Sequence, residues 1–226
     1  MEALEAALPA DAWPIFALGN HDRPRLASRL GLTRARVAAM LMLTLRGTPT
    51  LLYADELGML DQAVAPERQR DYFGLTAGGV SRDPSRTPMP WDGGPNGGYA
   101  PAGAPPLWLP VWEHHRTHNV EAQLADQTSI LHLYRRLIGL RRSSAALREG
   151  DYATHPASDA RRLVFARAAE GERKLVALNV SDAPCRLELG EDGEIIVSTA
   201  LDRAGERVTG TLALRPAEGV VMEASP

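Results

Sequence analysis

The spacing of apolar residues changes near Gly150, and this change limits what the chain can fold into more than any other feature. Before it, apolar residues between about Asp126 and Arg141 recur every three or four positions, as in a helix with one buried face. After it, they lie in short runs separated by turn-forming residues, which is typical of an antiparallel sandwich. We therefore expect a mixed domain of helices and strands over residues 1–147 and an antiparallel β-sandwich over residues 148–226.

The sandwich prediction rests on six short apolar segments. Turn-forming pairs that contain glycine lie between several of them. We expect each segment to form a strand, because alternating or short apolar runs bounded by turn formers suit half-buried strands. The segments are residues 163–166, 175–178, 187–189, 195–197, 212–214 and 220–222.

The start of the chain alternates between strand-like and helix-like segments. An apolar run over residues 13–18 stops at Gly19, and a second run over residues 49–53 follows Gly47. Between them, residues 33–46 carry apolar side chains at helical spacing. Continuous apolar runs of this length suit strands that are buried on both faces. The order of strand, helix and strand favours parallel strands joined by a crossover helix.

A long segment without a regular apolar period covers residues 55–119. It holds most of the 17 prolines and three of the four tryptophans. A loop of this length inside a compact domain is usually functional or disordered, and the spacing of the tryptophans among prolines favours an ordered loop. The helix that follows is expected to be capped by Asp126 or Thr128.

Composition and charge exclude several classes of protein. The formal net charge of -3 gives no electrostatic reason to expect nucleic acid or an anionic membrane as a partner. The single cysteine, Cys185, excludes an internal disulfide framework and a thiolate metal cage. No stretch approaches the roughly 20 apolar residues that span a bilayer, and the first residues lack the basic start of a signal peptide. We expect a soluble cytoplasmic protein with no cofactor and no metal.

Polar residues cluster just after the first apolar run. Residues 19–25 place His21, Asp22 and two arginines at the carboxyl end of a predicted buried strand. In α/β folds, sites are built at this end of the sheet, because the loops there surround its open edge. An adjacent histidine and aspartate could orient a polar ligand through charge-assisted hydrogen bonds. A capped turn with an aspartate–arginine ion pair would give the same pattern, and both interpretations stay open.

Several blocks resemble one enzyme family in the same order along the chain. Residues 16–25, 45–49, 53–59, 82–92 and 119–123 are similar to segments of the alpha-amylase family of glycoside hydrolases, in its oligo-1,6-glucosidase and alpha-glucosidase branch. The resemblance covers nearly the whole chain. It implies that residues 1–147 are the C-terminal portion of a (β/α)8 barrel, with its last two strands and helices and a long loop over residues 55–119.

The resemblance also implies roles for four residues. Asp22 matches the carboxylate that stabilises the transition state, and His21 matches the neighbour that hydrogen-bonds the sugar. Arg25 and Arg86 lie in blocks that border the sugar site, so they are candidate substrate-binding residues; structural ion pairs are the alternative for both. One position departs from the family, because Ala54 stands where a glycine usually precedes the two acidic residues. An alanine there restricts the backbone, so the geometry of this loop is in question.

Retaining glycosidases need a nucleophilic carboxylate and an acid/base about 5 to 5.5 Å apart. In the family that this chain resembles, these groups follow the fourth and fifth barrel strands, before the His21–Asp22 block. We therefore expect a fragment of an alpha-glucosidase-type enzyme that acts on alpha-glucosidic bonds of oligosaccharides and is inactive alone. Its partners would be the oligosaccharide and the missing N-terminal half of the barrel. A transglycosylating relative, of the trehalose synthase or sucrose isomerase type, and a non-catalytic carbohydrate-binding or scaffolding remnant are the alternatives.

Two weaker patterns have competing interpretations. His114 and His118 are one helical turn apart, but no acidic partner accompanies them, so we expect a solvated loop and no metal site. The tryptophans of the long loop could stack on sugar rings or form a small core of their own. We expect Trp91 to pack, and leave both interpretations open for Trp108 and Trp112.

Overall fold

The computed structural model describes residues 7–9, 12–76 and 80–224. The chain divides into two compact units. The first, called the sandwich unit below, comprises residues 1–16, 36–50 and 133–226; the second, called the loop unit, comprises residues 17–35 and 51–132. The division predicted between residues 147 and 148 stays a prediction.

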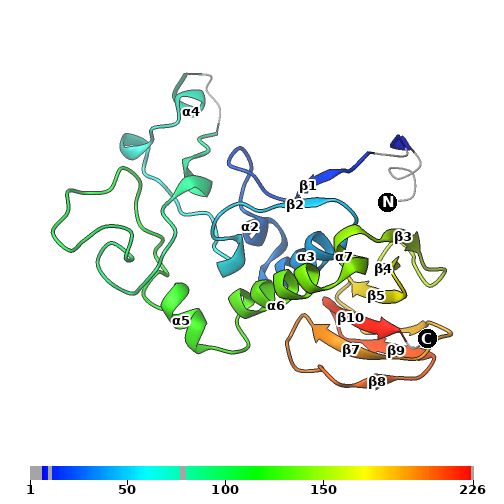
Figure 1. Ribbon diagram of the computed structural model, residues 1–226. Helices are drawn as coiled ribbons and strands as arrows, with labels where there is room; N and C mark the ends of the chain where they lie inside the picture. Colours follow the sequence, from blue (N-terminus) through cyan, green and yellow to red (C-terminus); the bar gives the residue numbers. More distant parts are fainter. Residues whose placement is uncertain (1–6, 10–11, 77–79, 225–226) are drawn as a thin grey trace. The chain divides into compact units, whose positions relative to one another are not determined.

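The N-terminal segment forms the predicted strand, helix and strand. β1 (Ile15–Ala17) and β2 (Thr48–Thr50) pair in a two-stranded sheet (Figure 1), and between them along the chain lie α2 (Leu26–Leu30) and α3 (Leu32–Thr44). The expectation that both strands are buried on both faces is wrong, since Ile15 of β1 is 74% exposed and Thr48 and Thr50 of β2 are exposed. The reason is that, among the described residues, no third strand joins this sheet.

Short turns replace regular structure over most of residues 55–119, as predicted. The elements there are η1 (Asp55–Leu57), η2 (Pro66–Arg68), α4 (Tyr72–Thr76) and η3 (Asp83–Arg86). Trp112 is buried in a small core with Leu57, Met59 and Leu131, so this tryptophan packs. Trp91 was expected to pack as well, but it remains 49% exposed.

The residue before η1 adopts a conformation that an alanine rarely takes. Ala54 has φ 66° and ψ 4° in the left-handed region, and its side chain is fully buried. Glycine reaches this region without a steric cost, whereas other residues lose roughly 1–2 kcal/mol there. The loop therefore keeps a glycine-like path although an alanine occupies the position.

The last helices end the mixed part of the chain. α5 (Val120–Ala125) is capped by Asn119, whose Oδ1 accepts a hydrogen bond from the Ala122 amide at 2.8 Å. α6 (Ile130–Ser143) is capped differently from the prediction, since Ser129 Oγ accepts from the His132 amide at 3.3 Å. Asp126 instead forms the preceding turn by accepting from the Thr128 amide at 2.9 Å. The short α7 (Ala145–Glu149) follows, and Ser144 caps it.

Two antiparallel sheets form the predicted β-sandwich. The strands of the six-stranded sheet, in the order β3-β4-β5-β10-β7-β8, are labelled in Figure 1. The second sheet pairs β6 with β9. All six predicted strands are confirmed, and β3 and β8 are additional. The bounds are β3 (Asp151–Thr154), β4 (Arg162–Ala169), β5 (Glu172–Asn179), β6 (Cys185–Glu188), β7 (Gly193–Ser198), β8 (Arg207–Val208), β9 (Thr211–Leu214) and β10 (Glu218–Ala224).

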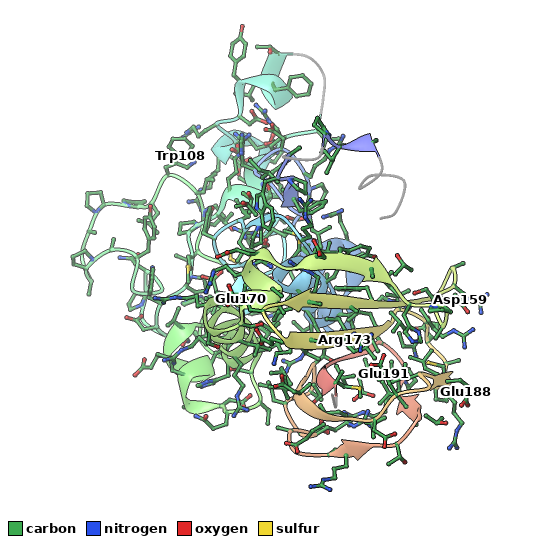
Figure 2. The ribbon with its side chains drawn as sticks, turned by 45° about the vertical axis from the view of Figure 1, so that its right-hand side comes forward. Trp108, Asp159, Glu170, Arg173, Glu188 and Glu191 are labelled. Carbon is green, nitrogen blue, oxygen red and sulfur yellow. The ribbon has the colours of Figure 1, made fainter. Side chains whose placement is uncertain are left out.

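Apolar side chains from both sheets fill the space between them. Val164 and Leu175 of the larger sheet belong to one buried cluster with Leu187 and Leu212 of the smaller sheet. Burial of this kind is worth roughly 25 cal/mol per Å² of apolar surface, so it is the main term that holds the sandwich together. Outside the core, Arg173 and Glu191, labelled in Figure 2, form an ion pair at the surface.

No helix in the described parts of the chain is long and apolar enough to cross a membrane. The cytoplasmic location expected from the sequence stays a prediction.

Candidate functional site

A tight turn beyond the C-terminal end of β1 carries His21 and Asp22, as predicted. Asn20 shapes the turn: its Oδ1 accepts a hydrogen bond from the Asp22 amide at 2.9 Å, and its carbonyl oxygen accepts one from the Arg23 amide at 3.3 Å. Asparagine favours turns because its side chain can bond the backbone two residues on. The side chains of His21 and Asp22 stay 67% and 48% exposed, so both can reach a ligand.

Three cationic or polar side chains surround one oxygen of Asp22. Asp22 Oδ1 accepts from Arg82 Nη1 at 2.7 Å and from Arg86 Nη2 at 3.0 Å, and His21 Nε2 lies 3.4 Å away. Oδ2 accepts no hydrogen bond from the described residues. Burial alone would raise the pKa of Asp22, but the hydrogen bond from Arg82 and the charges of the three neighbours outweigh it and hold the pKa below its ordinary value. Asp22 is therefore ionised at neutral pH.

Arg82 is itself held in place by Asp71. Arg82 Nε donates to Asp71 Oδ2 at 2.9 Å and Nη2 donates to Oδ1 at 2.6 Å, which is a bidentate pair. Hydrogen bonds from Arg82 hold the pKa of the buried Asp71 carboxyl far below its usual range. Because Asp71 fixes one edge of the Arg82 guanidinium, Nη1 at the other edge has a defined position beside Asp22.

Arg86 joins the same cluster through an ion pair with Asp22, and its role in binding substrate stays a prediction. Its Nε donates to the His21 carbonyl oxygen at 2.8 Å, while its Nη2 contacts Asp22. Arg82 immediately precedes η3 and Arg86 ends it, so one turn of 3-10 helix carries both arginines. Asp83, fully buried in this turn, accepts from the amides of Arg70 at 2.6 Å and Asp71 at 2.9 Å. These bonds fix the loop that brings the arginines to Asp22.

Arg25 takes a different place from the one that a substrate-binding residue needs. Its side chain is fully buried, its Nη1 donates to the Tyr53 carbonyl oxygen at 2.8 Å, and its guanidinium lies 4.8 Å from the centre of the Tyr53 ring. Its backbone amide donates to Asp61 Oδ1 at 2.9 Å. In the described structure these contacts support the fold of the loop unit, and the substrate-binding role of Arg25 stays a prediction.

Histidines of the long loop do not gather into a metal site. His114 and His118 both lie edge-on to the ring of Trp112, at centroid distances of 5.4 and 5.9 Å. His118 Nδ1 lies 3.0 Å from Thr117 Oγ1, and His114 Nε2 lies 3.8 Å from Glu113 Oε1. Within the described ranges, no group of three or more histidine, cysteine or acidic residues could hold a metal ion.

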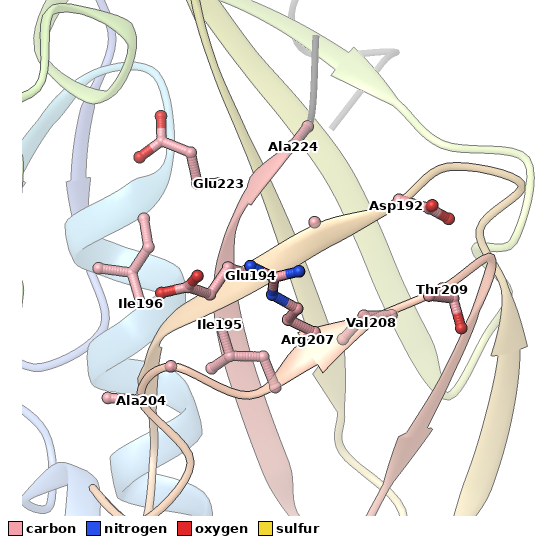
Figure 3. Close-up of a pocket in the computed structure, with 12 residues that line it drawn as sticks. Asp192, Glu194, Ile195, Ile196, Ala204, Arg207, Val208, Thr209, Glu223 and Ala224 are labelled. Atoms are coloured by element: carbon pink, nitrogen blue, oxygen red, sulfur yellow. The ribbon is translucent and has the colours of Figure 1, made fainter.

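A cavity of about 770 Å³ in the sandwich unit is a second place where a ligand could fit (Figure 3). β7, β8 and β10 line it, and its charged side chains include Glu194, Arg207 and Glu223. Its lining includes none of the residues that the sequence singled out for chemistry. The Asp22 cluster is therefore the candidate functional site.

Sequence reasoning missed Arg82 and Asp71 as members of the site. Arg82 belongs to the same block as Arg86, four residues before it, and this spacing on a tight turn was the available signal. No comparable signal existed for Asp71, which lies in an irregular segment and is positioned by hydrogen bonds to Arg82.

Comparisons with known proteins agree with the resemblance seen in the sequence. The family model for the alpha-amylase catalytic domain matches residues 1–150. A salivary alpha-glucosidase of Anopheles gambiae is 33% identical over 96% of this chain, and the amino acid transporter heavy chain SLC3A1 of Mus musculus is 31% identical over 96%. The crystal structure of the trehalulose synthase MutB from Pseudomonas mesoacidophila MX-45 covers 99% of this chain with a TM-score of 0.84 and 27% identity.

The chain spans less than half of each of these proteins. It corresponds to 39% of the mosquito enzyme, 32% of the mouse protein and 45% of MutB. Together with the fold, these matches show the C-terminal portion of a (β/α)8 barrel followed by an antiparallel sandwich. The chain belongs to the alpha-amylase family of glycoside hydrolases, in its alpha-glucosidase branch.

Proposed function

We propose that the chain supplies part of the sugar site of an alpha-glucosidase-type enzyme that acts on alpha-glucosidic bonds of oligosaccharides. The observation that carries the proposal is the ionised, half-exposed carboxylate of Asp22 with one oxygen bound by two arginines and the other open to a ligand. Two neighbouring sugar hydroxyls can donate to such an oxygen. These bonds, and the negative charge, grow more favourable as the ring gains oxocarbenium character.

Neighbouring groups fit the same role. His21 is exposed and adjacent, so its ring can hydrogen-bond a hydroxyl of the same sugar. Arg86 keeps its remaining N–H groups beside Asp22 and can donate to a ring or hydroxyl oxygen. Asp22 is thus proposed as the transition-state-stabilising residue, with His21 and Arg86 as sugar-binding residues and Arg82 as a positioning residue.

We further propose that the 226 residues bind sugar but do not hydrolyse it alone. Hydrolysis needs a free nucleophilic carboxylate and a protonated acid about 5 to 5.5 Å apart. The carboxylates around Asp22 are committed elsewhere: Asp71 to Arg82, and Asp83 to backbone amides. The two catalytic carboxylates would come from the preceding half of the barrel, on the same or a companion polypeptide.

Turnover with and without that half tests the proposal. The purified chain should release no glucose from maltose or isomaltose. Joined to a polypeptide that carries the first barrel strands of a relative, it should release glucose, and Asp22→Asn should lower kcat by about 10²- to 10³-fold. Release of glucose by the chain alone would contradict the proposed inactivity, and a normal kcat in the variant would remove Asp22 from the mechanism.

A transglycosylating activity is the first alternative, and the similarity to a trehalulose synthase favours it. The active, joined protein would be incubated with sucrose and its products separated. Isomeric disaccharides would support the transferase, whereas free glucose and fructose would support the hydrolase.

A non-catalytic carbohydrate-binding or scaffolding role is the second alternative. It is favoured by the similarity to an amino acid transporter heavy chain. Calorimetry of the chain with maltose distinguishes a non-catalytic binding protein from part of an enzyme. A non-catalytic binding protein should bind maltose with a Kd in the micromolar range. A partial enzyme site should bind no better than about millimolar, since much of its contact surface lies on the missing half.

A further inference from the structure

Phe73 of α4 covers one face of the arginine that holds Asp22. The Arg82 guanidinium carbon lies 5.4 Å from the centre of the Phe73 ring, within the range of a cation–π contact. The edges of the same guanidinium are bound to Asp71 and Asp22, so the ring adds a contact to its flat face. Phe73 is 53% exposed, so burial alone gives it little reason to lie here. The contact with Arg82 is therefore the specific interaction of this ring.

Hydrogen bonds to Asp71 hold α4, which is labelled in Figure 1, beside Arg82. Asp71 Oδ1 accepts from the Phe73 amide at 3.3 Å, and the Asp71 carbonyl oxygen accepts from the Leu75 amide at 3.1 Å. The same carboxyl accepts from the backbone amide of Arg82 at 2.8 Å, as well as from its guanidinium. One buried carboxylate thus fixes both the turn that carries the ring and the arginine that the ring covers.

A glycine lets α4 approach the backbone next to Arg82. A Cβ atom added at Gly74 would lie 2.7 Å from the Cα atom of Ser81, which is closer than Cβ atoms come to a neighbouring backbone. Any side chain at this position would push α4 away from residues 81–82 and lift the ring from the guanidinium. Phe73 and Gly74 therefore combine the covering ring with the residue that permits its close approach.

A covered guanidinium holds its partners better than one that is open to water on both faces. The ring excludes water from one face, and charges attract each other more strongly where water is excluded. It also blocks rotation of the guanidinium away from the orientation in which Nη1 lies 2.7 Å from Asp22 Oδ1. We propose that Phe73 is a positioning residue, which acts through Arg82 to hold the Asp22 carboxylate in the orientation that a sugar meets.

The consequence for sugar binding rests on the proposed function of Asp22, whereas the contact between Phe73 and Arg82 does not. Burial alone would raise the pKa of Asp22, and the hydrogen bond from Arg82 is the main cause that lowers it. If Arg82 is less firmly held, this pKa should rise whether or not the chain binds sugar. A positively charged, glucose-shaped iminosugar should also bind more weakly, because its charge is attracted to the Asp22 carboxylate.

Phe73→Leu tests the inference, because leucine keeps apolar volume but has no aromatic face. Carbon-detected NMR of the side-chain carboxyl should show a higher pKa of Asp22 in this variant, and the iminosugar should bind about two- to fivefold more weakly. Phe73→Tyr keeps the ring and should retain the native pKa and affinity. Tyr72→Leu is the matched control on the same helix, since Tyr72 is 77% exposed and, in the described structure, no cation–π contact joins it to Arg82.

An unchanged pKa of Asp22 in Phe73→Leu would overturn the inference, as would an equal rise in Tyr72→Leu. A second measurement needs no substitution: nuclear Overhauser effects should join the Phe73 ring protons to the Arg82 side chain in the native protein, and their absence would also overturn it. Failure of the proposed function is a separate result. If the pKa rises in Phe73→Leu but the native chain binds the iminosugar no better than neutral glucose, Phe73 positions Asp22 and the role proposed for Asp22 is wrong.

Discussion

Arg82 Nη1 lies 2.7 Å from Asp22 Oδ1, and the two residues are 60 positions apart in the chain. The other edge of the same guanidinium is bound to Asp71. The charge state and orientation of Asp22 therefore depend on how the loop that carries Asp71 and Arg82 folds. A carboxylate that must be ionised to stabilise positive charge gains from such neighbours, because they favour its charged form.

The first prediction concerns the pKa of Asp22. In Arg82→Ala the main hydrogen bond that lowers this pKa is lost, so the pKa should rise towards or above the ordinary aspartate value. Carbon-detected NMR of the side-chain carboxyl during a pH titration measures it. Arg23→Ala is the control and should leave the pKa unchanged. Arg23 is adjacent in sequence, but in the described structure its side chain makes no hydrogen bond or ion pair with Asp22. Equal pKa values in the native and Arg82→Ala proteins would contradict the account.

The second prediction concerns stability between pH 4 and 6. Burial raises the pKa of Asp55 to about 6, against the opposing hydrogen bond from the Leu52 amide. The folded state therefore keeps a proton that the unfolded chain has released above its ordinary pKa of 3.8. The stabilising contribution of protonated Asp55 is complete below pH 3.8 and is lost as the pH rises through about 6. The contribution of Asp55 to the free energy of unfolding should fall by about 3 kcal/mol over this window.

Asp55→Asn tests this, because the amide has nearly the same shape and does not titrate. Urea unfolding at several pH values should show that, between pH 4 and 6, the stability of the native protein falls relative to that of the variant by about 3 kcal/mol. Glu56→Gln, at the neighbouring position, is the control and should show the same relative fall. Carboxyls with lowered pKa values, such as Asp71, add stability as the pH rises, so the test is the difference between the two proteins. The same pH dependence in the native protein and in Asp55→Asn would disprove the raised pKa.

The third prediction concerns Arg167, which is fully buried in β4. Its guanidinium donates to the carbonyl oxygens of Thr44 at 2.6 Å, Gly150 at 2.9 Å and Asp151 at 3.2 Å. Arg167→Met would leave these carbonyl oxygens without their donor, and should lower the free energy of unfolding by about 2–4 kcal/mol. The control, Arg173→Ala, removes a surface ion pair with Glu191 and should cost at most about 1 kcal/mol. Equal costs for the two variants in urea unfolding would contradict the role of Arg167.

The sandwich was predictable from the sequence because its strands carry their own signal. Each run, such as residues 175–178, pairs with a neighbour and buries apolar side chains in the shared core. β8 was missed because only two residues form it, too few to show a period. The strands β1 and β2 were placed correctly, but their expected burial was wrong. Burial of a strand depends on neighbours, and in the described structure their sheet has only two members.

The site was predictable in part for a similar reason. His21 and Asp22 follow a strand directly, so their place at its end could be read from the local pattern, and Arg86 was added by the family resemblance. The bond from Arg82 to Asp22 depends on the path of an irregular loop, which no local period records. Arg25 shows the converse: it lies three residues after Asp22, yet its side chain turns inward onto Tyr53 and stays buried.

Binding of a positively charged, glucose-shaped iminosugar tests the central claim about Asp22 most directly. Such a compound imitates the charge of the oxocarbenium-like transition state, so an ionised carboxylate at the site should hold it more tightly than neutral glucose. NMR titration of the native chain and of Asp22→Asn with both ligands gives four affinities. The account predicts a loss of about tenfold or more for the iminosugar in the variant and a smaller loss for glucose. Equal affinities of the native chain and the variant for the iminosugar would contradict it.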